Sequence, residues 1–284
     1  MLGFGNSPQE ALVASLLAMA LVGFFASSLM RWRGLARLTD FLMPAALLAA
    51  YWLTYNKVPP FPPVGAVNKA FYVIAVGTAI GFAAEIAAPR AVRLLALLQP
   101  VAAAFYVGAP RLGVASWEVA LAAVAGMAFM GLVFLRGATG TEGDVKRGGV
   151  IAVLALGFAP IALLGASSSS FQLCLMFAAG CFGILVVHSL KPAFRFGGAS
   201  SIGALGGLIA IADTVVLITR KADLIALAVL ALCLVLPAFS APVCRTCGLS
   251  RPFPRLFTHV ALAALPAAAA LAVASIHYGS SFPI

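Results

Sequence analysis

The chain is short of charged residues: Asp, Glu, Lys and Arg occupy only 9% of its 284 positions. Soluble globular proteins carry about 25% charged residues, because water has to solvate their surface. Apolar residues, in contrast, make up 63% of the sequence, and the mean hydropathy is +1.09. This composition excludes a water-soluble globular protein and predicts an integral membrane protein whose outer surface faces lipid.

The motifs of common energy-coupling and hydrolytic sites are also lacking. The sequence contains no G-x-x-x-x-G-K-[ST] phosphate loop, no H-E-x-x-H zinc motif and no G-x-S-x-G nucleophile elbow. Three histidines are too few for the paired axial ligands of several b-type haems. We therefore expect no cofactor, and we expect any chemical energy to come from an ion gradient or a partner protein.

Cysteines are few as well, five in all. Cys174, Cys181 and Cys233 lie inside apolar runs, where a thiol behaves as a small apolar group. Cys244 and Cys247 form a C-x-x-C pair, which is half of a zinc site or a redox couple. A complete zinc site needs two further ligands, so this pair is only a weak metal candidate and we expect no bound metal.

Long apolar runs, bounded by charge, proline or glycine, predict about ten membrane-spanning helices. A helix needs roughly 20 apolar residues to cross about 30 Å of hydrocarbon. The runs cover residues 11–30, 41–55, 70–88, 94–110, 117–135, 149–165, 171–188, 198–219, 224–240 and 258–276. They leave no room for a soluble catalytic domain, and the predicted fold class is an all-α polytopic membrane bundle.

Lys and Arg are distributed unequally between alternate loops, which predicts the orientation. One set of loops holds Arg31, Arg33, Arg37, Arg90, Arg93, Arg136, Lys146, Arg147, Lys191, Arg195, Arg245, Arg251 and Arg255. The other holds Lys57, Lys69, Arg111, Arg220 and Lys221. Because loops rich in Lys and Arg stay in the cytoplasm, we expect both termini outside, and we expect the chain in a bacterial cytoplasmic (inner) membrane.

The same basic residues indicate the partners. A basic rim on the cytoplasmic side attracts anionic lipid, so the net charge of +10 does not require nucleic acid. We expect membrane lipids as partners, with partner membrane subunits as a further alternative, and no nucleic acid.

The chain divides into two predicted halves, residues 1–136 and 149–284, joined by a cytoplasmic Gly-rich linker over residues 137–148. Each half holds five spans, and an odd number of spans inserts the second copy upside down. This arrangement is the inverted repeat of many secondary transporters. The third and eighth spans then correspond, and so do the fourth and ninth, with Pro100 and Pro237 as expected helix breaks.

Two pairs of glycines support the correspondence of the third and eighth spans. Gly77 and Gly81 stand four residues apart in one span, and Gly203 and Gly207 in the other. Such small-xxx-small pairs let membrane helices approach closely, so we assign these glycines to helix packing. Each pair is followed by an acid, Glu85 in the third span and Asp213 in the eighth.

Three polar residues in the spans are the candidates for substrate or ion coupling. Asp213 lies seven residues before Arg220, about 10 Å along a helix, and an acid that deep costs at least roughly 2.5 to 3.5 kcal/mol. A proton or cation site explains it, and a hydrogen-bonded polar anchor is the alternative.

Glu85 and Gln99 are the other two candidates. Glu85 is close to Pro89 and Arg90, so a position at the headgroup level explains it as well as a site inside the membrane does. Gln99 could contact substrate or bond the carbonyl that Pro100 leaves free.

The leading functional hypothesis is a secondary transporter that moves a small or lipophilic solute by alternating access, coupled to protons or another cation. In length and span count the chain resembles the compact carriers of the drug/metabolite and bile-acid or auxin-efflux classes, a likeness of shape that transfers no residue role. Two alternatives stay open. One is a non-transporting integral subunit of a larger membrane complex, and the other is an intramembrane enzyme acting on lipid-linked substrates.

Overall fold

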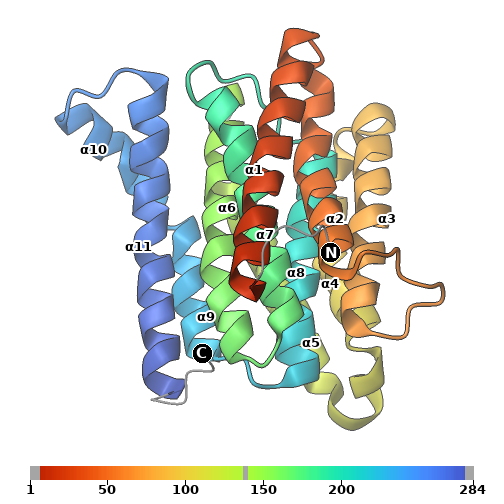
Figure 1. Cartoon of the computed structure of the whole chain (residues 1–284). Helices are drawn as coiled ribbons and strands as arrows, with labels where there is room; N and C mark the ends of the chain where they lie inside the picture. Colours follow the sequence, from red (N-terminus) through yellow and green to blue (C-terminus); the bar gives the residue numbers. More distant parts are fainter. Residues whose placement is uncertain (1–6, 137–139, 279–284) are drawn as a thin grey trace.

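The computed structural model describes residues 7–136 and 140–278, and the regular structure within these ranges is helical (Figure 1). The α-helices are α1 (Pro8–Trp32), α2 (Leu42–Tyr55), α3 (Ala66–Ala87), α4 (Ala91–Val107), α5 (Leu112–Arg136), α6 (Gly140–Leu164), α7 (Ser168–Ser189), α8 (Gly206–Asp213), α9 (Leu224–Ala231), α10 (Ser240–Thr246) and α11 (Pro252–Tyr278). Short 3-10 helices lie at η1 (Ala36–Phe41), η2 (Ala109–Arg111), η5 (Leu232–Leu234) and η6 (Leu236–Phe239). Two π-helices, η3 (Ala199–Leu205) and η4 (Thr214–Thr219), flank α8.

Eight helical segments of the described chain are long and apolar enough to cross a membrane. They are Pro8–Trp32, Ala66–Ala87, Ala109–Leu135, Gly140–Leu164, Ser168–Ser189, Ala199–Thr219, Leu224–Thr246 and Pro252–Tyr278. The two remaining predicted spans coincide with the shorter helices α2 and α4, of 14 and 17 residues. The all-α class and a multi-pass membrane protein are therefore confirmed.

Local signals explain where the first helix begins and ends. The Ser7 hydroxyl accepts the N–H of Glu10, and the Glu10 carboxylate accepts the N–H of Ser7. This capping box satisfies two of the N–H groups that a helix start leaves without partners. The helix ends before Gly34, which has a φ of 69° that a residue with a side chain rarely adopts.

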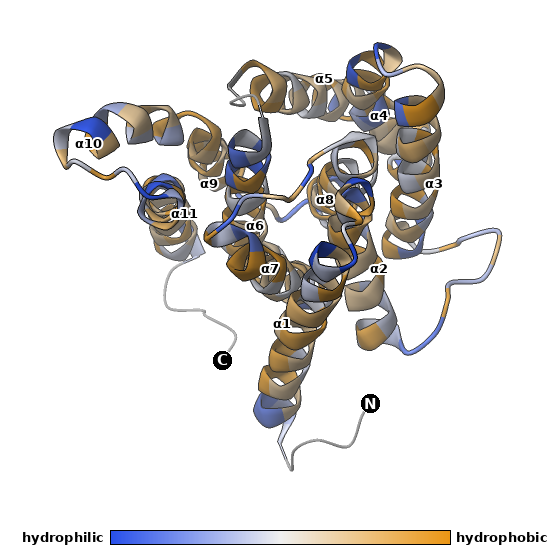
Figure 2. Ribbon diagram, turned by 90° about the horizontal axis from the view of Figure 1, so that it is seen from above, coloured by the Kyte–Doolittle hydropathy of each residue, from blue (hydrophilic) through white to orange (hydrophobic). Residues whose placement is uncertain are grey.

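The interior of the bundle is formed by α6, α7 and the segment 199–219. In α6 and in the segment 199–219, 78% of the most apolar 18-residue stretch is buried. The corresponding share is 17% in α1 and in α11. Seen from above, α8 lies among α2, α3, α4, α6 and α7 (Figure 2). The segment that carries Asp213 is thus enclosed by other helices, whereas α1 and α11 have large apolar faces free for lipid.

Hydrogen bonds show that alternate connections meet at opposite ends of the bundle. At one end, Arg31 at the end of α1 donates to the carbonyl of Val187 at the end of α7, over 2.6 Å. At the other, Glu118 pairs with both Arg111 and Arg220, each at 3.0 Å. We call the first of these the basic end, because the connections there are rich in Lys and Arg. These connections cover residues 31–39, 88–93, 190–198 and 240–255.

The predicted linker differs from the structure. Residues 137–139 lie outside the described residues, but α6 begins at Gly140, so Gly140 to Gly148 are helical. Two ion pairs within this helix start explain the difference: Lys146 with Glu142 at 2.7 Å, and Arg147 with Asp144 at 3.3 Å. Pairs at these spacings stabilise a helix by about 0.2 to 0.5 kcal/mol each, which offsets part of the cost of the glycines. Burial of α6 in the bundle supplies the rest.

Only one of the two expected proline breaks is present. Pro237 lies in η6, where the segment 224–246 leaves the α-helical path. Pro100, in contrast, stays inside a continuous α4, so the expected break there is wrong. Gly126 of α5 explains how the ring is accommodated, because a Cβ on this glycine would lie only 2.8 Å from the Pro100 Cβ.

The four glycines assigned to packing lie at the contact between α3 and the segment 198–207. A Cβ on Gly77 would lie 2.7 Å from the carbonyl oxygen of Ile202, and one on Gly81 would collide with the backbone of Gly198. On the opposite side of the contact, Gly203 faces Thr78 and Gly207 faces Ile74. The absence of side chains at these positions brings the two backbones together.

Candidate functional site

The segment 199–219 changes its helical form twice. It runs as a π-helix over η3, as an α-helix over α8 and again as a π-helix over η4. π-Helical turns are rare, and they occur frequently at functional sites because they leave the regular hydrogen-bond ladder. Asp213 is the last residue of α8, directly at the second change of form.

Asp213 is buried, with 5% of its surface exposed. Its Oδ2 atom has no hydrogen-bond partner in the described part of the chain. Because Gly206 stands seven residues earlier on the same helix, the two residues share one face of α8. That face is turned toward α4, since the Gln99 side chain of α4 lies directly against Gly206.

Gln99 is a second polar side chain without a partner. Both Oε1 and Nε2 are buried, and neither forms a hydrogen bond among residues 7–136 and 140–278. The carboxamide therefore does not bond the carbonyl that Pro100 leaves free, which was the alternative interpretation of this residue. Along α8, the level of Gly206 is about 10 Å from Asp213, so Gln99 and Asp213 line the same helix contact without touching.

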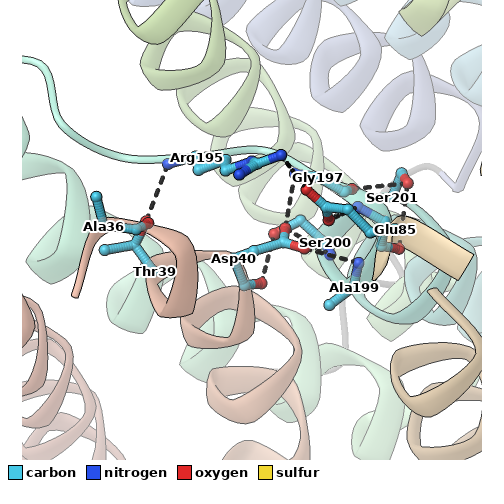
Figure 3. Close-up of polar contacts among 10 residues, drawn as sticks. Ala36, Thr39, Asp40, Glu85, Arg195, Gly197, Ala199, Ser200 and Ser201 are labelled. Carbon is cyan, nitrogen blue, oxygen red and sulfur yellow. Dashed lines mark hydrogen bonds and ion pairs between the residues drawn. The ribbon is translucent and has the colours of Figure 1, made fainter. Parts of the chain in front are cut away.

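Glu85 lies at the start of the segment 199–219, at the basic end of the bundle. Its Oε2 atom accepts the N–H of Gly198 at 2.9 Å, and its Oε1 atom pairs with Arg195 (Figure 3). Next to it, Asp40 accepts the N–H groups of Gly197 at 2.7 Å, Ala199 at 2.8 Å and Ser200 at 3.0 Å. Two carboxylates thus satisfy four consecutive N–H groups at the start of the segment 199–219.

This double cap fixes the N-terminal end of the central segment. The first N–H groups of a helix lack intrahelical partners and carry partial positive charge, which carboxylates neutralise. Thr39 adds a further contact by accepting the N–H of Arg195 at 3.0 Å. Burial raises the pKa of the Asp40 carboxyl to about 6, although the hydrogen bonds from Ser200, Gly197 and Ala199 oppose this rise.

Sequence reasoning missed Asp40, because it precedes an apolar run and so resembles an ordinary headgroup residue. A usable signal was the run Gly197 to Ser201, which consists of small residues before an apolar helix and has no acid of its own. Such a helix start requires an acceptor from elsewhere in the chain.

A chain of hydroxyl groups reaches the residue that follows Asp213. Ser167 donates to Ser170 at 2.8 Å, and Ser170 lies 3.4 Å from the hydroxyl of Thr214, the residue that follows Asp213. All three side chains are buried. Ser167 adjoins the exposed Ala166, so the hydroxyls extend from the connection between α6 and α7 into the bundle. Ser168, between the two buried serines, is exposed, so the connection between α6 and α7 has a solvated side as well as a buried one.

The cysteine pair remains a poor candidate for a metal. Cys244 is buried at the end of the broken segment 224–246, Cys247 is exposed, and both are free thiols. Within the described ranges, no group of three His, Cys, Asp or Glu side chains is placed to hold a metal ion.

The chain matches no protein-family model, and no curated protein is significantly similar to it. A function therefore has to be argued from the chemistry of the site.

Proposed function

We propose that the chain is a secondary carrier in which Asp213 binds and releases a proton or another cation as a small or lipophilic solute crosses. The observation that carries this proposal is the Asp213 carboxyl, which is buried and lacks a hydrogen-bond partner at Oδ2 among the described residues. An ionisable group without a partner in the membrane interior costs several kcal/mol, and such groups mark ion and proton pathways. Gln99 and Asp213 would line the path between α4 and α8.

The hydroxyl chain from Ser167 through Ser170 to Thr214 supports a route for the cation. Hydroxyl groups both donate and accept hydrogen bonds, so a series of them can conduct a proton or coordinate a small cation. The route would open at the end of the bundle opposite the basic end. Glu85 is not part of this path, because it caps the segment 199–219 together with Asp40.

The orientation belongs to the same proposal. We propose ten spans, both termini outside and the basic end in the cytoplasm, with spans one to five and six to ten as inverted copies. Successive connections lie at alternate ends of the bundle. This alternation is consistent with ten crossings, in which α2 and α4 cross the membrane together with the eight longer segments. A single cysteine placed at Ala66 should react with a membrane-impermeant reagent in intact cells, and one at Gly140 should not. The reverse pattern would contradict the orientation.

A non-transporting subunit of a larger complex is the second candidate, and one observation favours it. A cavity at the basic end is lined by neither Asp213 nor Gln99. A subunit needs no solute path to these two side chains, so a cavity elsewhere fits that role.

The proposal is tested with purified chain in sealed vesicles. Vesicles under an imposed pH gradient are given a mixture of small and lipophilic solutes, and accumulation is read by mass spectrometry. Asp213→Asn should abolish gradient-driven accumulation, because the amide cannot exchange a proton. The matched control is Asp223→Asn at the cap of α9, where asparagine caps equally well and can still accept a hydrogen bond from His277, so accumulation should persist. Wild-type accumulation by Asp213→Asn would remove Asp213 from the mechanism.

A further inference from the structure

A cavity of about 300 Å³ lies at the basic end, between the ends of α5, α6 and α11 and the broken segment 224–246. The break in this segment explains the space. From Leu232 the chain follows 3-10 turns past Pro237 and then turns aside into α10, instead of continuing as a straight helix beside α6 (Figures 1 and 2).

The polar lining of this cavity is basic. Lys146 and Arg147 of α6 reach it, together with Ser240 and His259, and none of the described residues that line it is acidic. Ser240 and the Nδ1 atom of His259 are 2.8 Å apart, which fixes the orientation of both side chains. The remaining walls are apolar, with Val150, Ile151 and Leu234 among them.

The acids around the cavity neutralise its cations only in part. Glu142 is shared between Lys146 at 2.7 Å and Arg255 at 3.2 Å, so one carboxylate serves two cations. Asp144 pairs with Arg147 through Nη1 at 3.3 Å. Three cations thus face two carboxylates, which leaves one positive charge in excess beside the cavity.

Arg147 also has an unused donor. Its Nε atom is buried and has no hydrogen-bond acceptor in the part of the chain that the structure describes. The Arg147 side chain lines the cavity and is 19% exposed, so its guanidinium group can pair with an anion there as well as with Asp144. Guanidinium and ammonium groups side by side are the donors that proteins use for phosphate.

We propose that this cavity binds a phosphate ester, held by Lys146 and Arg147 and oriented by Ser240. The apolar walls would contact the organic part of the ligand. Either a phospholipid headgroup from the adjoining leaflet or a soluble phosphate ester has this chemistry, and basic pockets between membrane helices are known to take lipid headgroups. This inference does not depend on the proposed transport function.

The test uses the whole chain in nanodiscs of phosphatidylcholine, with and without phosphatidylglycerol. Native mass spectrometry counts the phosphatidylglycerol that stays bound, and the thermal unfolding midpoint is measured in parallel. A second series adds inorganic phosphate or glycerol phosphate to nanodiscs of phosphatidylcholine alone. Retained phosphatidylglycerol assigns the site to lipid, and a raised midpoint with the soluble anions assigns it to a soluble ester; either result supports the phosphate site.

Variants separate the cavity from general attraction to the basic end. Arg147→Gln should weaken binding about tenfold, because a hydrogen bond to a charged group is lost. Arg251→Gln removes an exposed charge at the same end outside the cavity and should leave binding unchanged. Ala241→Trp keeps every charge but fills the mouth of the cavity, so it should also reduce binding even if Arg147→Gln folds poorly.

Three results would overturn the inference. The first is the absence of binding by both lipid and soluble phosphate. The second is wild-type binding by Ala241→Trp. The third is an equal loss in Arg251→Gln and Arg147→Gln, which would attribute the binding to the surface charge of the basic end.

Discussion

At Asp213 and Gln99 the protein buries polar atoms that have no hydrogen-bond partner among the described residues. The two cases were not equally visible in the sequence. An acid inside an apolar run is conspicuous, so Asp213 could be selected without any structure. The role of Gln99 could not be decided from the sequence. Whether its carboxamide bonds the carbonyl that Pro100 leaves free depends on the direction of the side chain. Nothing local to the sequence determines that direction.

Gln99→Leu separates a functional carboxamide from a structural one. Removing two buried polar atoms that have no partners should leave the unfolding midpoint unchanged or raise it, because their desolvation is no longer required. Gradient-driven solute accumulation should fall, since the path loses its polar group. Both quantities are measured on purified chain, the midpoint in detergent and the accumulation in vesicles.

The control for this variant is Asn68→Leu. Asn68 Oδ1 accepts a hydrogen bond from the Tyr51 hydroxyl at 2.7 Å, so its loss should destabilise the protein by about 1 kcal/mol. An equal destabilisation by Gln99→Leu would mean that the Gln99 carboxamide supports the fold, and it would contradict a role for Gln99 in the solute path.

At the scale of elements, the segment 199–219 is held by its double cap and by glycine contacts with α3. The glycine pairs were readable in the sequence, because their spacing places both members of a pair on one helix face. The cap was not, since Asp40 and the N–H groups that it accepts are separated by more than 150 positions. Residues 140–148 of the predicted linker are helical, which their glycine content did not indicate.

Gly81→Ala tests the close contact of α3 with the central segment. The added methyl group would collide with the backbone of Gly198, which cannot move aside as a flexible side chain can. Overpacking of this kind typically costs about 1 to 3 kcal/mol, and the unfolding midpoint should fall accordingly.

Gly113→Ala is the matched control on α5, where no atom lies within 4 Å of an added Cβ. This substitution should be close to neutral, because Gly113 lies in the first turn of α5, before the non-helical Ala115, and an added methyl group meets no neighbour there. A similar loss of stability in both variants would show that the Gly81 contact is not specific.

For the whole molecule, the sequence predicted the helical class and a helix at each apolar run. This was possible because the bilayer sets the hydropathy and the length of a membrane-spanning helix. It could not predict which helices form the interior. The segment 199–219 is no more apolar than α1, with mean hydropathies of 2.1 and 2.2 for their best windows, yet one is enclosed and the other is largely exposed. That difference arises from packing, which depends on contacts between distant parts of the chain.

We propose that coupling of solute movement to a cation through Asp213 needs no protein besides this chain. This claim is tested most directly by gradient-driven solute accumulation in sealed vesicles that contain only the purified chain, compared with the Asp213→Asn variant and with protein-free vesicles. We expect accumulation above the protein-free level for the wild type, and none above that level for the variant. Equal accumulation by both proteins, or no accumulation by the wild type, would contradict the claim.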